Sequence, residues 1–324
     1  MDDRERGRGS VVGAADDAAA PLEDWLVRRS GIRRHEPLAR HSQYGIGGPA
    51  DWYLRLESVA RLPEVMRRCH QAGLPVTVIG AGSNSLILDG GIRGLVLELP
   101  RGRLREIGDD VIELPGGAMM PRAALDCAQR GIGGLEFGIG VPGTCGASVR
   151  GNAGAFGTEI RDVLIDCDLV APDGAAVHLI NPELGFGYRS SRLKRDLTGH
   201  VVTAARLRVG RELPETVRAL TDSIQAERRA TQPYNARSLG SMFTNPPGDH
   251  AGRLIDMAGL KGARVGGAEV SLLHANFIVN AGGASAADVL ALMDLVQRTV
   301  AERFGVHLVP EIAVLGEPLR DGQR

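Results

Sequence analysis

The spacing of apolar residues along the chain predicts three helices. In residues 58–71 and 285–304 apolar side chains recur every three or four positions, which is the spacing of one helix face. A further helix is predicted over 215–229. The segment 285–304 opens with Ser-Ala-Ala-Asp, a capping box, and ends at Gly305, so the sequence predicts both of its ends.

Short apolar runs separated by turn residues predict strands between these helices. The run at 75–79 (PVTVI) follows the first helix and predicts a short buried strand. Runs at 94–99, 111–114 and 200–209 are bounded by Gly, Pro and Asp-Gly turns. Residues 91–210 are therefore expected to form a mixed, mainly β domain, and a chain of 324 residues has room for two or three domains.

Charge and cysteine usage exclude several classes of protein. The 38 Lys+Arg and 39 Asp+Glu leave a formal charge of −1, so no overall positive field attracts nucleic acid. Residues 1–20 mix acidic and basic side chains, and no stretch of about 18 apolar residues occurs, so we expect a cytoplasmic protein with a disordered leader and no membrane contact. Cys69, Cys127, Cys145 and Cys167 form neither a C-x-x-C pair nor a cluster with His, which predicts reduced thiols and no metal site.

Glycine is unusually frequent, and its densest region is residues 131–157. Within it Gly138–Gly143 matches G-x-G-x-x-G, and Asp162 stands near the position of a ribose-binding acid. A dinucleotide fingerprint of this kind needs a helix to open at its third glycine, and Pro142 followed by repeated glycines makes a continuous helix improbable. We therefore predict a loop system, which forms either tight turns or a cradle of backbone amides for a pyrophosphate.

A second glycine cluster, residues 80–84 (GAGSN), directly follows the strand at 75–79. Glycine permits positive φ there, and Ser83 and Asn84 add short polar side chains. The chain lacks a Walker A motif, and a Rossmann motif is rejected above. Two glycine loops in this setting predict a dinucleotide held by another kind of fold.

Eight motifs, in order, are spread over nearly the whole range from about residue 38 to 316. They are HSQYGIGGPA at 41–50, VIGAGSNSLI at 78–87, GIGVPGTCGASVRGNAGAFG at 138–157, GFGYRSS at 185–191, GSMFTNP at 240–246, AGRLIDMAGLKG at 251–262, VSLLHANFIVN at 270–280 and FGVHLVPEI at 304–312. This series resembles the UDP-N-acetylenolpyruvoylglucosamine reductase family. The resemblance implies reduction of UDP-N-acetylglucosamine enolpyruvate to UDP-N-acetylmuramate for peptidoglycan, with FAD as cofactor and NADPH as hydride donor.

The resemblance also implies the fold and the domain boundaries. The fold is α+β: a vanillyl-alcohol-oxidase (PCMH) type FAD-binding α/β domain pair followed by a smaller α+β substrate-binding domain. The expected divisions are a leader at 1–21, FAD-binding subdomains at 22–98 and 99–212, the substrate-binding domain at 213–316 and a tail at 317–324. A monomer is expected.

Three residues match the family's catalytic positions: Arg189 in GFGYRSS, Ser241 in GSMFTNP and Glu311 in VPEI. A guanidinium suits an enolate-like charge that develops beside a carboxylate, so Arg189 is expected to hold it. Ser241 is expected to donate the proton to the neighbouring carbon. Glu311 is expected either to orient the arginine or, if protonated, to share in stabilising the enol.

Further site residues follow from the same resemblance. No histidine lies where covalently flavinylated relatives attach their cofactor, so FAD is expected to bind noncovalently. The predicted FAD contacts are Gly80, Ala81, Gly82, Ser83, Asn84, Ser85, Pro142, Gly143, Thr144, Gly146, Ala147, Ser148, Asn152, Ala153 and Gly154. The predicted substrate contacts are Tyr188, Asn245, Arg253 and Lys261, the last two as partners of the UDP phosphates.

The chain departs from the family pattern at a few positions. Thr244 stands where the family often has lysine, Ser85 where an apolar residue is common, and Ala147 where a second glycine is common. From Val209 only about six residues lead to the next helix, so there is no room for the tyrosine-bearing loop of the longer family form. The chain therefore resembles the shorter, second type.

Two other functions compete with this interpretation. One is an FAD-dependent sugar or alcohol oxidase of the same superfamily, and the motifs around Ser241 and Glu311 argue against it. The other is a non-catalytic protein that binds flavin or a UDP-sugar, which the complete catalytic triad disfavours.

Overall fold

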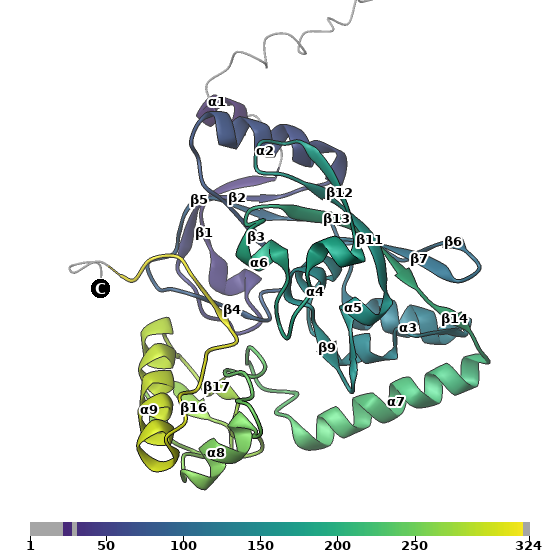
Figure 1. Ribbon diagram of the computed structural model, residues 1–324. Helices are drawn as coiled ribbons and strands as arrows, with labels where there is room; N and C mark the ends of the chain where they lie inside the picture. The colour runs from purple at the N-terminus through teal and green to yellow at the C-terminus, as the bar shows by residue number, and fades with distance from the viewer. Residues whose placement is uncertain (1–21, 28–30, 320–324) are drawn as a thin grey trace, which may run out of the picture.

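The computed structural model describes residues 22–27 and 31–319, so the predicted leader at 1–21 lies outside the described residues, as does the tail from 320. The first sheet has the strand order β1-β2-β5-β3, with β1 antiparallel to β2 and the other two pairs parallel. Helix α2 packs its buried face against this sheet (Figure 1). The elements of this part are α1 (Leu22–Val27), β1 (Ile32–Pro37), η1 (Leu38–His41), β2 (Pro49–Arg55), η2 (Val59–Arg61), α2 (Leu62–Gln71), β3 (Val76–Ile79), β4 (Ser85–Ile87) and β5 (Ile92–Glu98).

The second sheet is antiparallel throughout, in the order β12-β11-β13-β7-β6. The elements that follow the first sheet are β6 (Arg105–Gly108), β7 (Val111–Pro115), α3 (Met120–Arg130), β8 (Ile132–Gly133), η3 (Glu136–Gly140), α4 (Cys145–Gly151), β9 (Gly154–Ala155), β10 (Thr158–Glu159), α5 (Ile160–Val163), β11 (Leu164–Val170), β12 (Ala176–Ile180), η4 (Asn181–Leu184), α6 (Arg192–Arg195), β13 (Val201–Arg208) and β14 (Gly210–Arg211). The mainly β texture predicted for residues 91–210 is confirmed, although helix α3 within it was not predicted.

Helix α7 leads away from the second sheet toward the C-terminal part of the chain (Figure 1). Its few buried residues, Val217, Thr221 and Ile224, lie on one face. The C-terminal part is an antiparallel sheet in the order β15-β16-β17 with helices α8 and α9. These elements are α7 (Pro214–Thr231), α8 (Ala251–Met257), β15 (Arg264–Val265), β16 (Ala268–Val270), β17 (Ile278–Asn280), α9 (Ala286–Phe304) and β18 (Ala313–Leu315).

Each of these parts has its own apolar core. Leu62, Leu95 and Leu97 belong to the core on the first sheet. A second core lies between the antiparallel sheet and the helices α3 and α4, and a third surrounds α9. Tyr44 belongs to the third core although it precedes β2 in sequence, and its hydroxyl donates to the Ile278 carbonyl at 3.1 Å. A segment near the N-terminus therefore helps to hold the C-terminal part in place.

One expectation is wrong in detail. Residues 131–157 are not purely a loop system, because Cys145–Gly151 form helix α4. The Thr144 hydroxyl caps this helix by accepting from the Ala147 amide at 3.4 Å, and Asn152 ends it in the left-handed conformation. The cap and the tight packing at Gly146 offset the low helix propensity of glycine. The Asp162 carboxylate accepts from the Glu159 amide and caps helix α5, so its contact in the structure is a structural one.

The four cysteines are free and buried. Burial raises the pKa of Cys69 to about 11 and, as the main cause, the pKa values of Cys127, Cys145 and Cys167 to about 12. In the part of the chain that the structure describes, no helix is long and apolar enough to cross a membrane. The same residues contain no group of three His, Cys, Asp or Glu side chains that could hold a metal ion.

The predicted capping box of α9 is confirmed: Ser285 Oγ accepts from the Asp288 amide at 3.1 Å, and Asp288 Oδ2 accepts from the Ser285 amide at 3.0 Å. A second carboxylate reaches the same helix end from the loop after β4. The Asp89 oxygens accept from the amides of Ala286 and Ala287 at 2.8 and 3.0 Å. A negative charge is favourable at the N-terminus of a 19-residue helix, so Asp89 stabilises the contact between α9 and the loop that joins β4 to β5.

We predict that Asp89→Ala lowers the free energy of unfolding by about 1 to 3 kcal/mol, because two charged hydrogen bonds and a helix-terminus interaction are lost together. Urea unfolding followed by circular dichroism measures the change. Asp294→Ala is the control, since the partner of Asp294 among the described residues is Arg298 on the exposed face of the same helix, and the change should be small. Equal effects of the two substitutions would contradict this assignment.

Candidate active site

A cavity of about 620 Å³ lies where the first and second sheets meet. Strand β3 and the first glycine loop line one wall, and the start of α4 lines another. The segment 310–313 closes the cavity from the C-terminal part of the chain. Three segments far apart in the sequence therefore enclose one space.

The two glycine loops touch at the mouth of this cavity. A Cβ atom at Gly80 would lie 2.7 Å from Thr144 Oγ1, and one at Gly143 would lie 3.6 Å from Ser83 Oγ. Glycine at position 80 is therefore required by close approach of the second loop. Small residues of both loops border a space that suits the diphosphate and the ribose groups of a dinucleotide, and the first loop is the one whose amides can serve it. The second-loop amides at 143 and 145–148 already bond within the protein. The residues present fit FAD.

The predicted FAD contacts divide into three groups. Those that line the cavity are Gly80, Asn84, Ser85, Thr144, Gly146 and Ala147, while Ala81 and Pro142 line a neighbouring cavity described below. The walls formed by the described residues do not include Gly82, Ser83, Gly143, Ser148, Asn152, Ala153 or Gly154. Asn152 is fully buried, and its amide group bonds to Glu159, Gly187 and the Arg161 amide, so it supports the loop.

Arg189 and Glu311, which are 122 residues apart in sequence, meet beside the cavity. Arg189 Nε donates to Glu311 Oε1 at 2.9 Å, and its Nη2 donates to the Gly154 carbonyl at 3.2 Å. Arg189 has φ of +52°, a left-handed conformation that few residues other than glycine adopt. Lys194 Nζ donates to the Arg189 carbonyl at 2.8 Å and so holds this strained residue in place.

Burial dominates the electrostatics of this pair. It raises the pKa of Glu311 above its ordinary value, although the charges of Arg189 and Lys194 act in the opposite direction. Burial lowers the pKa of Lys194, and the neighbouring Arg150 lowers it further. Both Arg150 and Lys194 line the cavity, and the sequence analysis missed both. Lys194 follows Arg189 by five residues, so a basic residue this near the predicted catalytic arginine was the available signal.

Ser241 lies beside Glu311 through backbone pairing. The Glu311 amide donates to the Met242 carbonyl at 2.8 Å, and the Thr244 amide donates to the Val309 carbonyl at 2.9 Å. Ser241 therefore sits in the segment that pairs with the Glu311 segment. Its hydroxyl makes no hydrogen bond to any described residue, and it is in neither cavity wall, although Gly240 before it lines the second cavity.

The four predicted substrate contacts are not brought together. Tyr188 is exposed, and the Arg189 guanidinium lies over its ring at 5.2 Å. Asn245 Oδ1 accepts from the Ala251 amide at the start of α8. Arg253 pairs with Asp249, Lys261 Nζ donates to Asp256 Oδ2 at 2.7 Å, and neither lines the two cavities. Of these four, Tyr188 is the one whose side chain contacts a predicted catalytic residue, Arg189.

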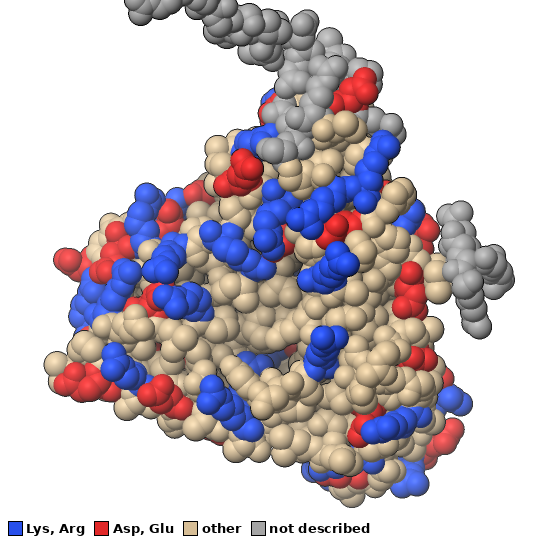
Figure 2. Space-filling model, turned by 180° about the vertical axis from the view of Figure 1, so that it is seen from behind, with Lys and Arg blue, Asp and Glu red and all other residues tan. Residues whose placement is uncertain are grey.

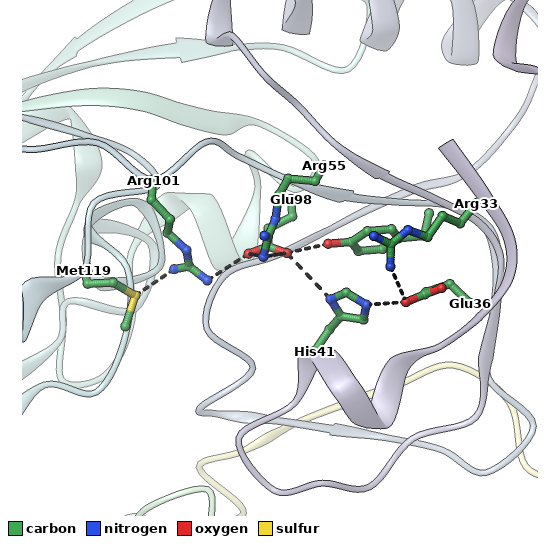
Figure 3. Close-up of polar contacts among 8 residues, drawn as sticks. Arg33, Glu36, His41, Arg55, Glu98, Arg101 and Met119 are labelled. Atoms are coloured by element: carbon green, nitrogen blue, oxygen red, sulfur yellow. Dashed lines mark hydrogen bonds and ion pairs between the residues drawn. The ribbon is translucent and has the colours of Figure 1, made fainter. Parts of the chain in front are cut away.

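A second cavity, of about 580 Å³, adjoins the first and shares Glu98 and Arg101 with it. Its wall also contains Arg40, Arg55 and Arg228, so cationic side chains outnumber the single carboxylate of its lining. Figure 2 shows a hollow on one face of the molecule with Lys and Arg side chains gathered around it. Glu98 itself is buried and lies in a chain of polar contacts from Glu36 to Met119 (Figure 3).

Comparison with known proteins agrees with this geometry. Residues 50–180 match a family model described as an FAD binding domain, and residues 232–315 match one described as the C-terminal domain of UDP-N-acetylenolpyruvoylglucosamine reductase. A crystal structure of the reductase from Thermus caldophilus superposes with a TM-score of 0.74 at 35% identity, covering 89% of this chain and 99% of that one. The predicted α+β fold with a vanillyl-alcohol-oxidase type FAD-binding part is thereby confirmed.

Relatives with this reductase's name extend over most of the chain. One from Symbiobacterium thermophilum is 44% identical over 90% of this chain and 94% of its own length. One from Rubrobacter xylanophilus is 45% identical over 87% of this chain and 95% of its own. One from Bacillus subtilis is 40% identical over 88% of this chain and 94% of its own. Identity at this level over nearly the full length confirms the resemblance seen in the motifs, and the chain belongs to the UDP-N-acetylenolpyruvoylglucosamine reductase family.

Proposed function

We propose that this protein catalyses the NADPH-driven, FAD-dependent reduction of UDP-N-acetylglucosamine enolpyruvate to UDP-N-acetylmuramate, a step of peptidoglycan precursor synthesis. The observation that carries the proposal is the Arg189–Glu311 contact at the edge of a cavity formed by two glycine loops, in a chain of this family. FAD, when bound, accepts hydride from NADPH and passes it to the enolpyruvyl β-carbon. The remaining chemistry belongs to the side chains.

Arg189 is proposed to stabilise the charge that develops when hydride adds. The double bond opens, and its electron pair moves toward the substrate carboxylate as an enolate. Arg189 Nε is engaged by Glu311 and one N–H of Nη2 by the Gly154 carbonyl, so the remaining Nη N–H groups are the donors available to that carboxylate. In this arrangement Glu311 acts as the positioning residue of Arg189.

Ser241 is proposed to donate the proton that completes the reaction. The enolate takes a proton from the Ser241 hydroxyl onto the carbon next to the hydride acceptor, which gives the saturated lactyl ether. Loss of a proton from serine is costly, so a nearby cation must stabilise the alkoxide. Arg189 and Lys194, which both surround Glu311, are the described cations near this segment.

The finer assignments are part of the same proposal. FAD is proposed to bind noncovalently between the two glycine loops, and the divisions at residues 98, 212 and 316 are proposed as domain boundaries. Tyr188 is the best supported of the four substrate contacts, because Asn245, Arg253 and Lys261 are bonded elsewhere. A monomer that acts in the cytoplasm on small molecules is proposed.

The purified protein should be yellow, and NADPH under anaerobic conditions should bleach it. Adding UDP-N-acetylglucosamine enolpyruvate should restore the colour and form UDP-N-acetylmuramate, detected by mass spectrometry. Acid or detergent should release the FAD, because no covalent bond is expected. Rapid reoxidation by oxygen with no response to the enolpyruvyl sugar would instead indicate an oxidase, and bound flavin with no turnover would indicate a binding protein.

Ser241→Ala should slow the sugar-reducing half-reaction by about 100-fold to 10,000-fold, the usual range for general acid catalysis. Flavin reduction by NADPH should remain nearly unchanged, because that step uses no proton from Ser241. Stopped-flow absorbance resolves the two half-reactions. Ser241→Cys should recover part of the rate, and Ser223→Ala on the exposed face of α7 is the control. Equal slowing of both half-reactions would show that Ser241 shapes the pocket instead.

Glu311→Gln should slow the sugar-reducing half-reaction because Arg189 loses its charged partner. In the wild type the same step should slow as the pH falls through the pKa of Glu311. That pKa is raised by burial, so protonation and loss of the ion pair begin at a higher pH than for an exposed glutamate. The substituted enzyme should lack this acidic limb. A wild-type rate that rises as the pH falls would indicate that the protonated form of Glu311 is the active one.

A further inference from the structure

Arg101 lies between the two cavities and near both glycine loops. It lines the first cavity together with Gly80, Asn84 and Thr144, and the second together with Ala81 and Pro142. Residues of both loops therefore line each cavity together with Arg101. Its side chain is 40% exposed, so it is accessible to a ligand in either cavity.

A buried carboxylate fixes the position of this guanidinium (Figure 3). Glu98 Oε1 accepts from Arg101 Nη2 at 2.8 Å and from Arg55 Nη2 at 2.9 Å, while the Tyr53 hydroxyl donates to Oε2 at 2.6 Å. Burial alone would raise the pKa of Glu98, but the bonds from Tyr53 and Arg55 and the charges of both arginines outweigh it and lower that pKa. Glu98 is therefore ionised at neutral pH.

His41 extends the same network toward the first sheet. Its Nε2 lies 2.9 Å from Glu36 Oε1, and its Nδ1 lies 3.8 Å from Glu98 Oε2. Glu36 also accepts from Arg33 Nη1 at 2.9 Å. His41 and Tyr53 therefore restrain the Glu98 carboxylate on the side away from Arg101, and Glu98 in turn restrains the Arg101 guanidinium.

Arg101 keeps donors free for a ligand. Of its five N–H groups, one meets Glu98, and one on Nη1 meets Met119 Sδ at 2.7 Å. Those are its partners among the described residues. Because two arginines share Glu98, the cluster also carries an unbalanced positive charge beside the loops.

We infer that Arg101, held by Glu98, binds the diphosphate of the flavin dinucleotide where the two glycine loops meet. Residues 80–85 and 142–148 of the two loops include no charged side chain, whereas a diphosphate carries two negative charges. A guanidinium matches phosphate oxygens with paired hydrogen bonds. The inference rests on the proposed function and names the residue that supplies the missing charge.

Two other ligands of this enzyme also carry diphosphates, namely the UDP-sugar and NADPH. The contact between the loops favours the flavin, because Gly80 and Thr144 approach each other next to Arg101, and both also line the first cavity. The affinities for the three ligands can be measured separately, so the source of the diphosphate is testable.

The test is the Arg101→Gln variant of the full chain, reconstituted with FAD. Its affinity for FAD should fall by about 10-fold to 100-fold, the usual size of a charged hydrogen bond to phosphate. Fluorescence quenching during FAD titration, and recovery of fluorescence on dilution of the holoenzyme, measure it. Wild-type affinity should weaken as salt is raised, and the variant should show a flatter salt dependence. Arg101→Lys should retain most of the salt dependence because it keeps the charge.

Arg105→Gln is the matched control, since it removes the same charge from an arginine that pairs with Glu113 away from both cavities. FAD affinity that falls without a change in salt dependence would overturn the inference, because Arg101 would then act through shape. Unchanged FAD affinity with a raised KM for the UDP-sugar or for NADPH would assign Arg101 to that ligand and also overturn it. Wild-type protein that binds no FAD would refute the proposed function itself.

Discussion

The segment 309–315 is paired on both of its sides, and the site depends on this constraint. On one side it bonds to residues 242–244 of the C-terminal part. On the other side Ala313 donates to the Asn84 carbonyl at 2.9 Å, and β18 runs parallel to β4. Glu311 takes part in the first attachment through its amide and precedes the second by two residues. A glutamate supplied from near the chain's end is thus fixed relative to the first glycine loop and to the serine segment at once.

Burial acts in opposite directions on the acid and the bases of this site. It disfavours the charged form of Glu311 and the charged form of Lys194, yet each charge stabilises the other. Arg189 meets Glu311 at hydrogen-bond distance, and its charge favours the ionised form of that carboxylate against the effect of burial. The Glu98 carboxylate is also buried, but hydrogen bonds from Tyr53 and Arg55 outweigh the effect of burial and lower its pKa. Glu311 and Glu98 are each paired with an arginine, and cationic side chains outnumber carboxylates in the lining of both cavities.

Much of this structure is predictable from the sequence because local signals agree with the fold. The α9 helix has its apolar stripe, its capping box at Ser285 and its glycine stop, and all three are present in the structure. Helix α4 was missed because its stability comes from the Thr144 cap and from packing around Gly146, which propensity does not record. Arg101 and Lys194 stand outside the eight motifs, and they line the first cavity only because distant segments, residues 310–313 among them, fold around the same space.

The buried thiols have a practical consequence for spectroscopy. All four cysteines lie in apolar cores, and their pKa values of about 11 to 12 keep them as thiols at neutral pH. Maleimide dyes and spin labels react with thiolates, so the native chain should give almost no background labelling. One cysteine introduced on the exposed face of α9 and another on α7 would then report the distance between these helices during turnover, without any need to replace the natural cysteines.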